Sequence, residues 1–211
     1  ESALLQFDIP YRVYGGQRFF ERLEIKNALA YMRLILNCHD DVAFERVVNI
    51  PTRGIGERTV DAVREHARNI SISMWSAAKA MIVDKSLNTR SANALAAFLN
   101  LINEMTNTLE ALPLSELAEN SIEMSGLIEM HRREKGERGQ SRVENLEELV
   151  GACKNFTPES IDTPVLAQFL DQVSLEAGER QANEDQDAVQ LMTLHSAKGL
   201  EFPLVIMAGM E

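Results

Sequence analysis

The sequence predicts a mainly α-helical protein in which a helical domain is inserted into a partial α/β domain. Strand-like segments occur only near the two ends of the chain, whereas residues 21–177 carry helical patterns throughout. Three short strands cannot form a covered sheet alone, so we expect both chain ends to contribute about three parallel strands to one α/β domain. The expected boundaries place residues 1–20 and 186–211 in the α/β part and residues 21–185 in the insertion.

The first half of the chain opens with a strand at residues 9–14 that stops at Gly15 and Gly16. Apolar residues then repeat with the spacing of one helix face over residues 25–36, and a second helix is expected over residues 41–48. Residues 89–110 repeat the helical pattern, so their apolar face must pack on other helices.

The second half continues as helices until the final strands return. Ser141 and Glu144 have capping-box spacing, which predicts a helix from there to about Lys154. A loop over residues 155–164 and an amphipathic helix over residues 165–177 follow. An acidic linker then leads to expected strands at residues 189–194 and 204–208.

Composition favours a soluble globular protein of a reducing cytoplasm. Of the 211 residues, 45% are hydrophobic and 25% charged, and no apolar run is long enough to span a membrane. Cys38 and Cys153 stand without disulfide or metal-ligand spacing, and the N-terminus has no signal-peptide pattern. Met74 and Trp75 are expected in the core.

The net charge of −11 argues against nucleic acid as a partner, but the charge is unevenly distributed. Residues 144–187 hold eleven acidic and two basic residues, a net charge of −9. Residues 11–33 and 131–142 each carry a net charge of +3. Local basic stripes therefore remain available to phosphates.

The most informative segment is residues 189–203, where an apolar strand leads into a polar turn that holds His195, Lys198 and Glu201. Open α/β sheets bind ligands at the carboxyl ends of their strands. The pattern alone is more typical of a strand followed by a capped turn whose charged side chains are solvated.

Two separated segments resemble motifs of the UvrD/Rep/PcrA helicases. They are Tyr-Arg-Val-Tyr-Gly-Gly-Gln-Arg-Phe-Phe-Glu-Arg-Leu-Glu-Ile-Lys at residues 11–26 and Met-Thr-Leu-His-Ser-Ala-Lys-Gly-Leu-Glu-Phe-Pro at residues 192–203. Residues 49–56 and 142–149 extend the likeness into the helical part, so the resemblance covers essentially the whole chain.

The resemblance implies part of a superfamily 1 motor that hydrolyses ATP with Mg²⁺ and moves 3′ to 5′ along single-stranded DNA in repair and replication. The α/β part would then belong to the second RecA-like domain (2A) and the insertion would be its accessory domain (2B). The chain has no phosphate-binding loop, and an arginine-finger motif is expected beyond residue 211. We therefore expect the chain alone to be inactive, and the whole protein to work in the bacterial cytoplasm at the nucleoid.

The resemblance also assigns roles to the end motif. Thr193 and His195 would contact single-stranded DNA, where a hydroxyl and an imidazole N–H can donate to phosphate. Lys198, Gly199 and Glu201 would face ATP, with Glu201 accepting hydrogen bonds from ribose hydroxyls.

Gly15, Gly16 and Arg18 form a further candidate contact with single-stranded DNA. Their backbone N–H groups and positive charge can approach a phosphate, with Phe19 or Phe20 available to stack on a base. A tight turn followed by core phenylalanines explains the same residues equally well.

The candidate duplex-binding turn comprises Arg53, Gly54, Ile55, Gly56, Arg58 and Thr59. A Gly-hydrophobic-Gly turn lets a helix N-terminus present backbone N–H groups to a DNA phosphate, as in helix-hairpin-helix modules. The alternative is a plain helix connection whose glycines serve only the turn.

A weaker DNA or partner surface is expected at Lys135, Arg138 and Arg142, because Glu134 and Glu137 dilute its charge. His39, His66 and His131 lack companions at metal-ligand spacing, so no metal site is expected.

The expected partners are single-stranded DNA and duplex DNA at junctions with 3′ tails, together with repair proteins. Unpaired edges of the partial sheet also predict self-association. A noncatalytic protein-interaction or regulatory module without DNA grip is the alternative function.

Overall fold

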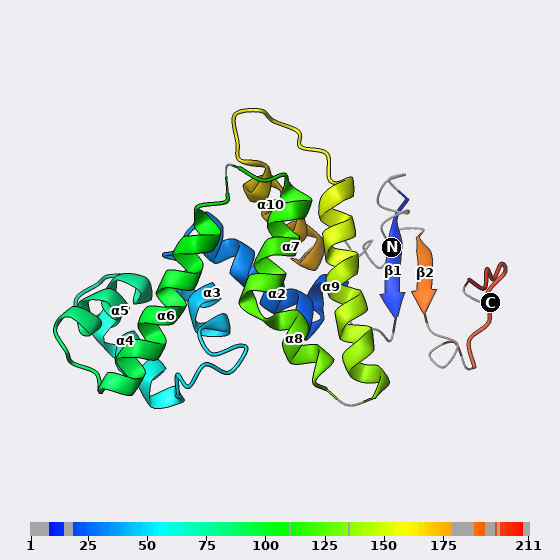
Figure 1. Cartoon of the computed structure of the whole chain (residues 1–211). Coiled ribbons are helices and arrows are strands. Elements are labelled where there is room, and N and C mark those ends of the chain that lie inside the picture. The colour runs from blue at the N-terminus through cyan, green and yellow to red at the C-terminus, as the bar shows by residue number, and fades with distance from the viewer. Residues whose placement is uncertain are drawn as a thin grey trace. The chain divides into compact units, whose positions relative to one another are not determined.

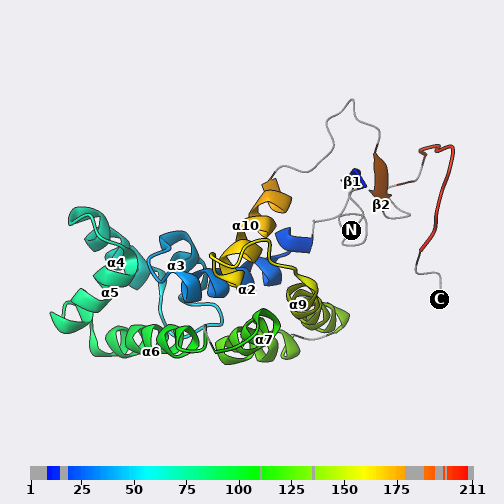
Figure 2. The same cartoon turned by 90° about the horizontal axis from the view of Figure 1, so that it is seen from above.

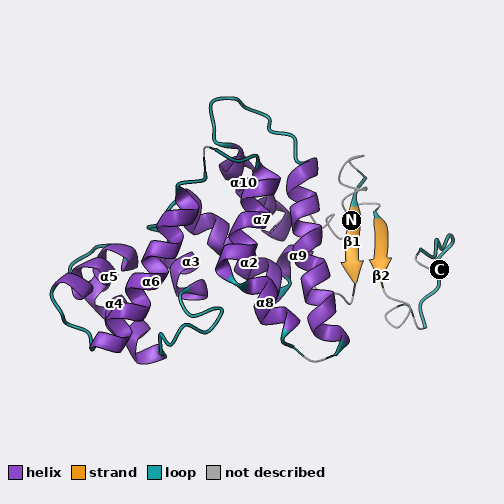
Figure 3. Cartoon of the chain, viewed as in Figure 1, coloured by secondary structure: helices purple, strands orange, loops and turns teal. Residues whose placement is uncertain are grey.

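The computed structural model describes residues 9–14, 19–109, 111–134, 136–178, 188–192, 197 and 199–208. Contacts divide the chain into two compact units, one of Glu1–Arg18 with Leu175–Glu211 and one of Phe19–Ser174. The described part is mainly helical, as predicted (Figures 1 and 3).

The smaller unit contains two short strands from opposite ends of the chain. Strand β1 (Tyr11–Tyr14) pairs in parallel with β2 (Val189–Met192) (Figure 1). In this register Tyr11 lies opposite Val189. The N–H of Val189 also donates to the carbonyl of Pro10 at 2.9 Å.

The prediction of about three parallel strands is not confirmed. Residues 204–208 form no strand, and the side chains of Leu204 and Ile206 are 79% and 84% exposed. A strand exists only through hydrogen bonds to a neighbour, and within the described residues the sheet has only two members. Apolar β-branched composition alone therefore overestimated the sheet.

The larger unit is a stack of helices. Its elements are η1 (Phe19–Glu21), α2 (Leu23–Leu36), α3 (Asp41–Val47), α4 (Glu57–Asn69), α5 (Met74–Val83), α6 (Thr89–Thr106), α7 (Leu114–Ser125), α8 (Leu127–Arg132), α9 (Glu137–Asn155) and the start of α10 (Val165–Gly178). No helix in the described ranges combines the length and the apolarity that a membrane span needs.

Helix α2 is the centre of this unit. It lies among the other helices of the unit (Figure 2) and contacts α3, α6, α7 and α9. Ten of its fourteen residues are buried. A helix buried on most sides needs apolar residues around its circumference, which the sequence from Ile25 to Ile35 supplies. Met74 and Trp75 are each 2% exposed, which confirms their expected place in the core.

Side-chain caps fix several helix starts. Asp40 accepts from the N–H of Ala43, and Asn88 accepts from the N–H of Ser91, both at 2.9 Å. The predicted capping box at Ser141 is wrong, because α9 begins one turn earlier at Glu137. Gly136 is the N-cap residue of this helix, with φ +86°, and it provides no side-chain cap.

Candidate nucleic-acid interface

The loop between α3 and α4 is held in one shape by the side chain of Asn49. Its Oδ1 accepts from the backbone N–H of Arg53 at 2.8 Å and from that of Ile55 at 3.2 Å. Ile55 is only 1% exposed, so the loop is anchored in the core at its middle. Gly54 is exposed and has φ +81°, a conformation that side chains disfavour.

Helix α4 begins at this loop without a side-chain cap. Gly56 is the N-cap residue, and its carbonyl accepts from Thr59 at 2.9 Å and from Val60 at 3.2 Å. Because glycine offers no side-chain acceptor, the N–H groups of Glu57 and Arg58 in the first turn keep their capacity to bind an anion. The side chains of Glu57 and Arg58 are exposed beside them.

Thr59 lies deeper than the sequence suggested. Its hydroxyl donates to Ser91 Oγ at 3.1 Å, which joins the start of α4 to the start of α6. Ser91 is 9% exposed. The Thr59 hydroxyl is thus engaged within the helical unit, whereas Arg58 at the preceding position is exposed.

Arg53 is also engaged within the unit. Its Nη1 donates to the carbonyls of Pro51 at 2.9 Å and Val47 at 3.5 Å, and its Nη2 donates to that of Ser125 at 2.8 Å. The guanidinium carbon lies 5.7 Å from the centre of the Tyr31 ring and 5.7 Å from that of Phe98.

Tyr31, on α2, also holds the loop between α3 and α4. The sequence did not identify it as a residue of this site. Its hydroxyl donates to the carbonyls of Ile50 and Val47. Burial raises the pKa of Tyr31 to about 12, while the neighbouring Arg53 acts in the opposite direction. A tyrosine among the apolar positions of a buried helix gives no sign in the sequence of which carbonyls it will reach.

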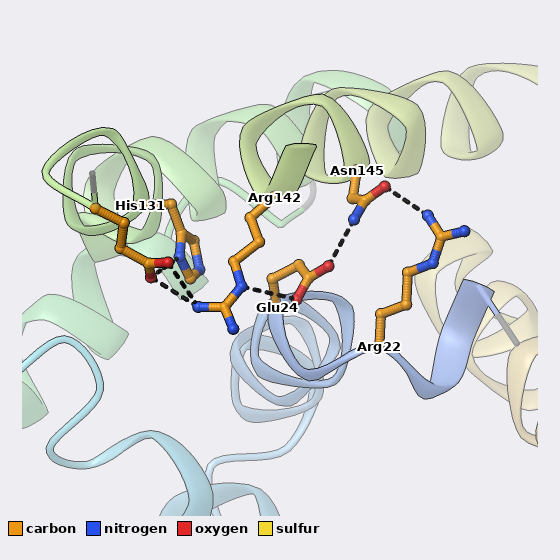
Figure 4. A network of polar contacts seen from close by, with 6 residues as sticks. Arg22, Glu24, His131, Arg142 and Asn145 are labelled. Atoms are coloured by element: carbon orange, nitrogen blue, oxygen red, sulfur yellow. Dashed lines mark hydrogen bonds and ion pairs between the residues drawn. The ribbon is translucent and has the colours of Figure 1, made fainter. Parts of the chain in front are cut away.

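A second polar cluster joins the start of α2 to α8 and α9 (Figure 4). Asn145 donates to Glu24 Oε1 at 2.6 Å and accepts from Arg22, while Arg142 lies 3.8 Å from Glu24 Oε2. Glu24 is 5% exposed, so these donors compensate for a carboxylate that is largely removed from water.

Glu134 continues this cluster towards α8. Arg142 Nη1 donates to both oxygens of Glu134, at 2.7 and 2.9 Å, and His131 Nδ1 lies 2.8 Å from Oε1. The hydrogen bond from His131, followed by that from Arg142, lowers the pKa of Glu134.

The expected basic surface at Lys135, Arg138 and Arg142 is divided by this arrangement. The guanidinium of Arg142 is bound to two carboxylates, and the Arg142 side chain is 24% exposed. Arg138 is exposed, and Lys135 lies outside the described residues. His131 is 1% exposed, and its Nε2 has no hydrogen-bond partner in the part of the chain that the structure describes. Among the described residues no cluster fit to hold a metal ion occurs.

The described residues include only part of the motif at residues 192–203 near the C-terminus. Gly199 has φ +86° in a turn closed by a hydrogen bond from Leu200 N–H to the Ala197 carbonyl at 3.0 Å. A Cβ at Gly199 would meet nothing within 4 Å, and Glu201 is exposed. Thr193, His195 and Lys198 lie outside the described residues.

The candidate single-strand contact near the N-terminus, Gly15, Gly16 and Arg18, lies outside the described residues as well. The rings of Phe19 and Phe20 meet edge to face at 5.0 Å, and both pack against the core as partly buried residues. Arg22 lies over the Phe19 ring at 5.4 Å. These contacts favour the interpretation of both phenylalanines as core residues.

Comparison with known proteins covers the entire chain. The family model of the UvrD-like helicase C-terminal domain matches residues 1–211. The chain is 54% identical over 213 residues to DNA helicase II of Escherichia coli (strain K12), covering 100% of the chain and 30% of that protein. It is 37% identical over 217 residues to the ATP-dependent DNA helicase PcrA of Bacillus subtilis (strain 168), covering 100% of the chain and 29% of that protein.

Proposed function

Because the chain belongs to the UvrD-like helicase C-terminal domain family, we propose that it is the part of an ATP-dependent DNA helicase that grips duplex DNA. The chain spans about 30% of the length of the relatives it matches, so the motor activity belongs to a longer protein. In this proposal residues 1–20 and 186–211 form part of a RecA-like motor domain, and residues 21–185 form its accessory insertion.

The uncapped start of α4 carries the proposal of duplex binding. The exposed Gly54, the N-cap Gly56 and the exposed Arg58 lie together at a helix N-terminus, where backbone N–H groups and the helix dipole favour an anion. Glu57 is exposed at the same turn and opposes an anion, so the amides and Arg58 must outweigh it. Such a contact holds phosphate and cannot read the base sequence.

The turn that contains Gly199 and Glu201 supports a contribution to ATP binding. Gly199 is exposed and carries no side chain, which permits close approach of a ligand, and the exposed carboxylate of Glu201 can accept hydrogen bonds from ribose hydroxyls. Mg²⁺ would arrive with the nucleotide and neutralise phosphate charge during hydrolysis. The proposal also includes Lys198 as an ATP contact. The proposed contacts with single-stranded DNA are Thr193, His195, Gly15, Gly16 and Arg18.

The direction of movement is proposed as 3′ to 5′, on DNA junctions with 3′ single-stranded tails, in repair and replication and with repair proteins as partners. The proposed setting is the bacterial cytoplasm at the nucleoid. The phosphate-binding loop of such motors is absent from this sequence, so we expect no ATP hydrolysis by the chain alone.

Duplex binding can be measured by fluorescence anisotropy with a labelled duplex that carries a 3′ tail, at several salt concentrations. We expect affinity to fall with salt, because bound phosphates release counterions. Arg58→Ala should weaken binding and reduce the slope of log K against log salt by about 1.

Arg68→Ala is the matched control. Arg68 is exposed near the other end of α4, about 15 Å along the helix from Arg58, and its loss changes the net charge equally. Equal losses for both variants, or no binding at low salt, would refute the proposed grip.

A further inference from the structure

The guanidinium of Arg53 sits where two helices end. Val47 is the last residue of α3 and Ser125 is the last residue of α7, and Arg53 donates to both of their carbonyls and to that of Pro51. Helix C-termini carry partial negative charge and carbonyls without helical partners. Arg53 therefore satisfies acceptors that the helices themselves leave open.

We propose that Arg53 is a positioning residue for the duplex-binding turn and is not itself a phosphate ligand. This inference rests on the proposed function of that turn. It assigns the phosphate contact to the first-turn amides of α4 and to Arg58, and it gives Arg53 the task of holding the turn in the shape that exposes them.

The contacts of Arg53 explain how it sets that shape. Its side chain ties the turn to the end of α7, 72 residues away, while its backbone N–H is held by Asn49. Gly126 follows Ser125 with φ +80°, and a Cβ there would lie 3.7 Å from Pro51 Cγ, so the α7–α8 junction packs closely on the turn.

The aromatic neighbours restrict Arg53 further. Tyr31 from α2 and Phe98 from α6 flank the guanidinium at 5.7 Å each, and both rings are fully buried. Because its planar guanidinium contacts both rings and the carbonyls, the Arg53 side chain is not free to reorient towards a phosphate. The carbonyls of Pro51 and Ser125 would also lose the hydrogen bonds that Arg53 donates if its side chain turned to DNA.

Lysine distinguishes the two roles. The ammonium group of lysine keeps the positive charge that binds a phosphate. It is compact and strongly hydrated, however, so it cannot donate to several separated carbonyls and also stack on aromatic rings as a guanidinium does. A phosphate ligand should therefore tolerate Arg→Lys, whereas the positioning role should not.

The test compares Arg53→Lys, Arg53→Ala, Arg58→Lys and Arg58→Ala in the 211-residue chain, using the tailed duplex and the anisotropy assay. We expect Arg53→Lys to weaken binding by about tenfold, as much as Arg53→Ala, because both remove the guanidinium that bridges the carbonyls of Pro51 and Ser125. Arg58→Lys should bind within about twofold of the unchanged chain, since the charge is kept.

Two results contradict different claims. If Arg53→Lys binds like the unchanged chain while Arg53→Ala loses one unit of salt slope, Arg53 is a phosphate ligand and the inference is wrong. If the unchanged chain does not bind duplex, the proposed function itself fails, and this assignment fails with it.

A second measurement uses the unchanged chain, so its outcome does not depend on whether a variant folds. In the ¹⁵N-labelled chain, addition of duplex should shift the Gly56 and Arg58 amide signals and the Arg58 side-chain Nε–H, and leave the Arg53 Nε–H in place. A shift of the Arg53 signal as large as that of Arg58 would overturn the inference.

Discussion

Glu134 shows how single side chains stabilise the helical unit. Its carboxylate receives hydrogen bonds from Arg142 on α9 and from His131 on α8, and both donors favour the ionised form. The pKa of Glu134 is accordingly below its ordinary value, so the charged state is linked to the folded state.

Glu134→Gln should lower the free energy of unfolding by about 1 kcal/mol at pH 7, a figure reduced for the partial exposure of Glu134. A lowered folded pKa gives stability that is complete above the ordinary carboxyl value of about 4.3 and disappears as pH falls through the folded value. Urea unfolding followed by circular dichroism at pH 7 and at pH 3 should show the difference from the unchanged chain shrinking in acid.

Glu129→Gln provides the comparison. Glu129 forms an ion pair with Arg133 in which the side chains are 58% and 77% exposed, and such pairs contribute little. A loss for Glu129→Gln as large as that for Glu134→Gln, or a difference independent of pH, would argue against the linkage.

Arg53 marks the limit of prediction at the level of residues. The sequence correctly drew attention to the turn through Gly54, whose φ is +81°. An arginine next to a glycine in a turn has the composition of a phosphate contact, and nothing local indicates that Arg53 donates to Ser125, 72 residues later. Every residue has a backbone carbonyl, so the residue type at a position does not indicate whether its carbonyl will accept a hydrogen bond from a distant side chain.

Helix α9 illustrates how one element depends on its packing. Gly139 lies inside α9, and a Cβ there would come within 2.5 Å of the His131 carbonyl and 2.8 Å of the Glu134 carbonyl. Gly151, in the same helix, would meet nothing within 4 Å. The two glycines therefore differ in what they permit.

Substitution by alanine should have opposite effects at these positions. Gly151→Ala should stabilise the protein by up to about 1 kcal/mol, because alanine has the higher helix propensity. Gly139→Ala should destabilise it by about 1–3 kcal/mol, because backbone atoms must move to admit the methyl group. Thermal melts of both variants check this. Stabilisation by Gly139→Ala would show that the close approach of the His131 and Glu134 carbonyls does not exclude a methyl group at this position.

Helices were more predictable than strands in this chain. The predicted helix over residues 41–48 is confirmed by α3 (Asp41–Val47), since its apolar spacing and Asp40 cap are local features. Residues 204–208 looked equally strand-like, yet strand formation depends on a hydrogen-bonding neighbour elsewhere in the chain. Residue types alone do not specify that neighbour.

On the scale of the whole molecule, the apolar core belongs to one unit. Within the described part of the chain, every buried apolar residue lies between Ile25 and Val173. The unit Phe19–Ser174 thus carries the packing that stabilises a domain.

A fragment of residues 19–174 should fold independently. We expect its melting temperature to lie within a few degrees of that of the whole chain, because the buried apolar area is retained. Circular dichroism of both proteins tests this, with Ile102→Ala in each as a reference for core loss, since Ile102 is fully buried. A fragment without cooperative melting would show that the chain ends supply essential stability.

The pairing of β1 with β2 has a kinetic consequence. Tyr11 and Val189 must meet across nearly the whole chain, and closing so long a loop in an unfolded polypeptide is entropically costly and slow. Folding of the intervening helices reduces the flexible length that remains to be closed. The strand pair should therefore form last, after the helical unit has brought the distant segments within reach of one another.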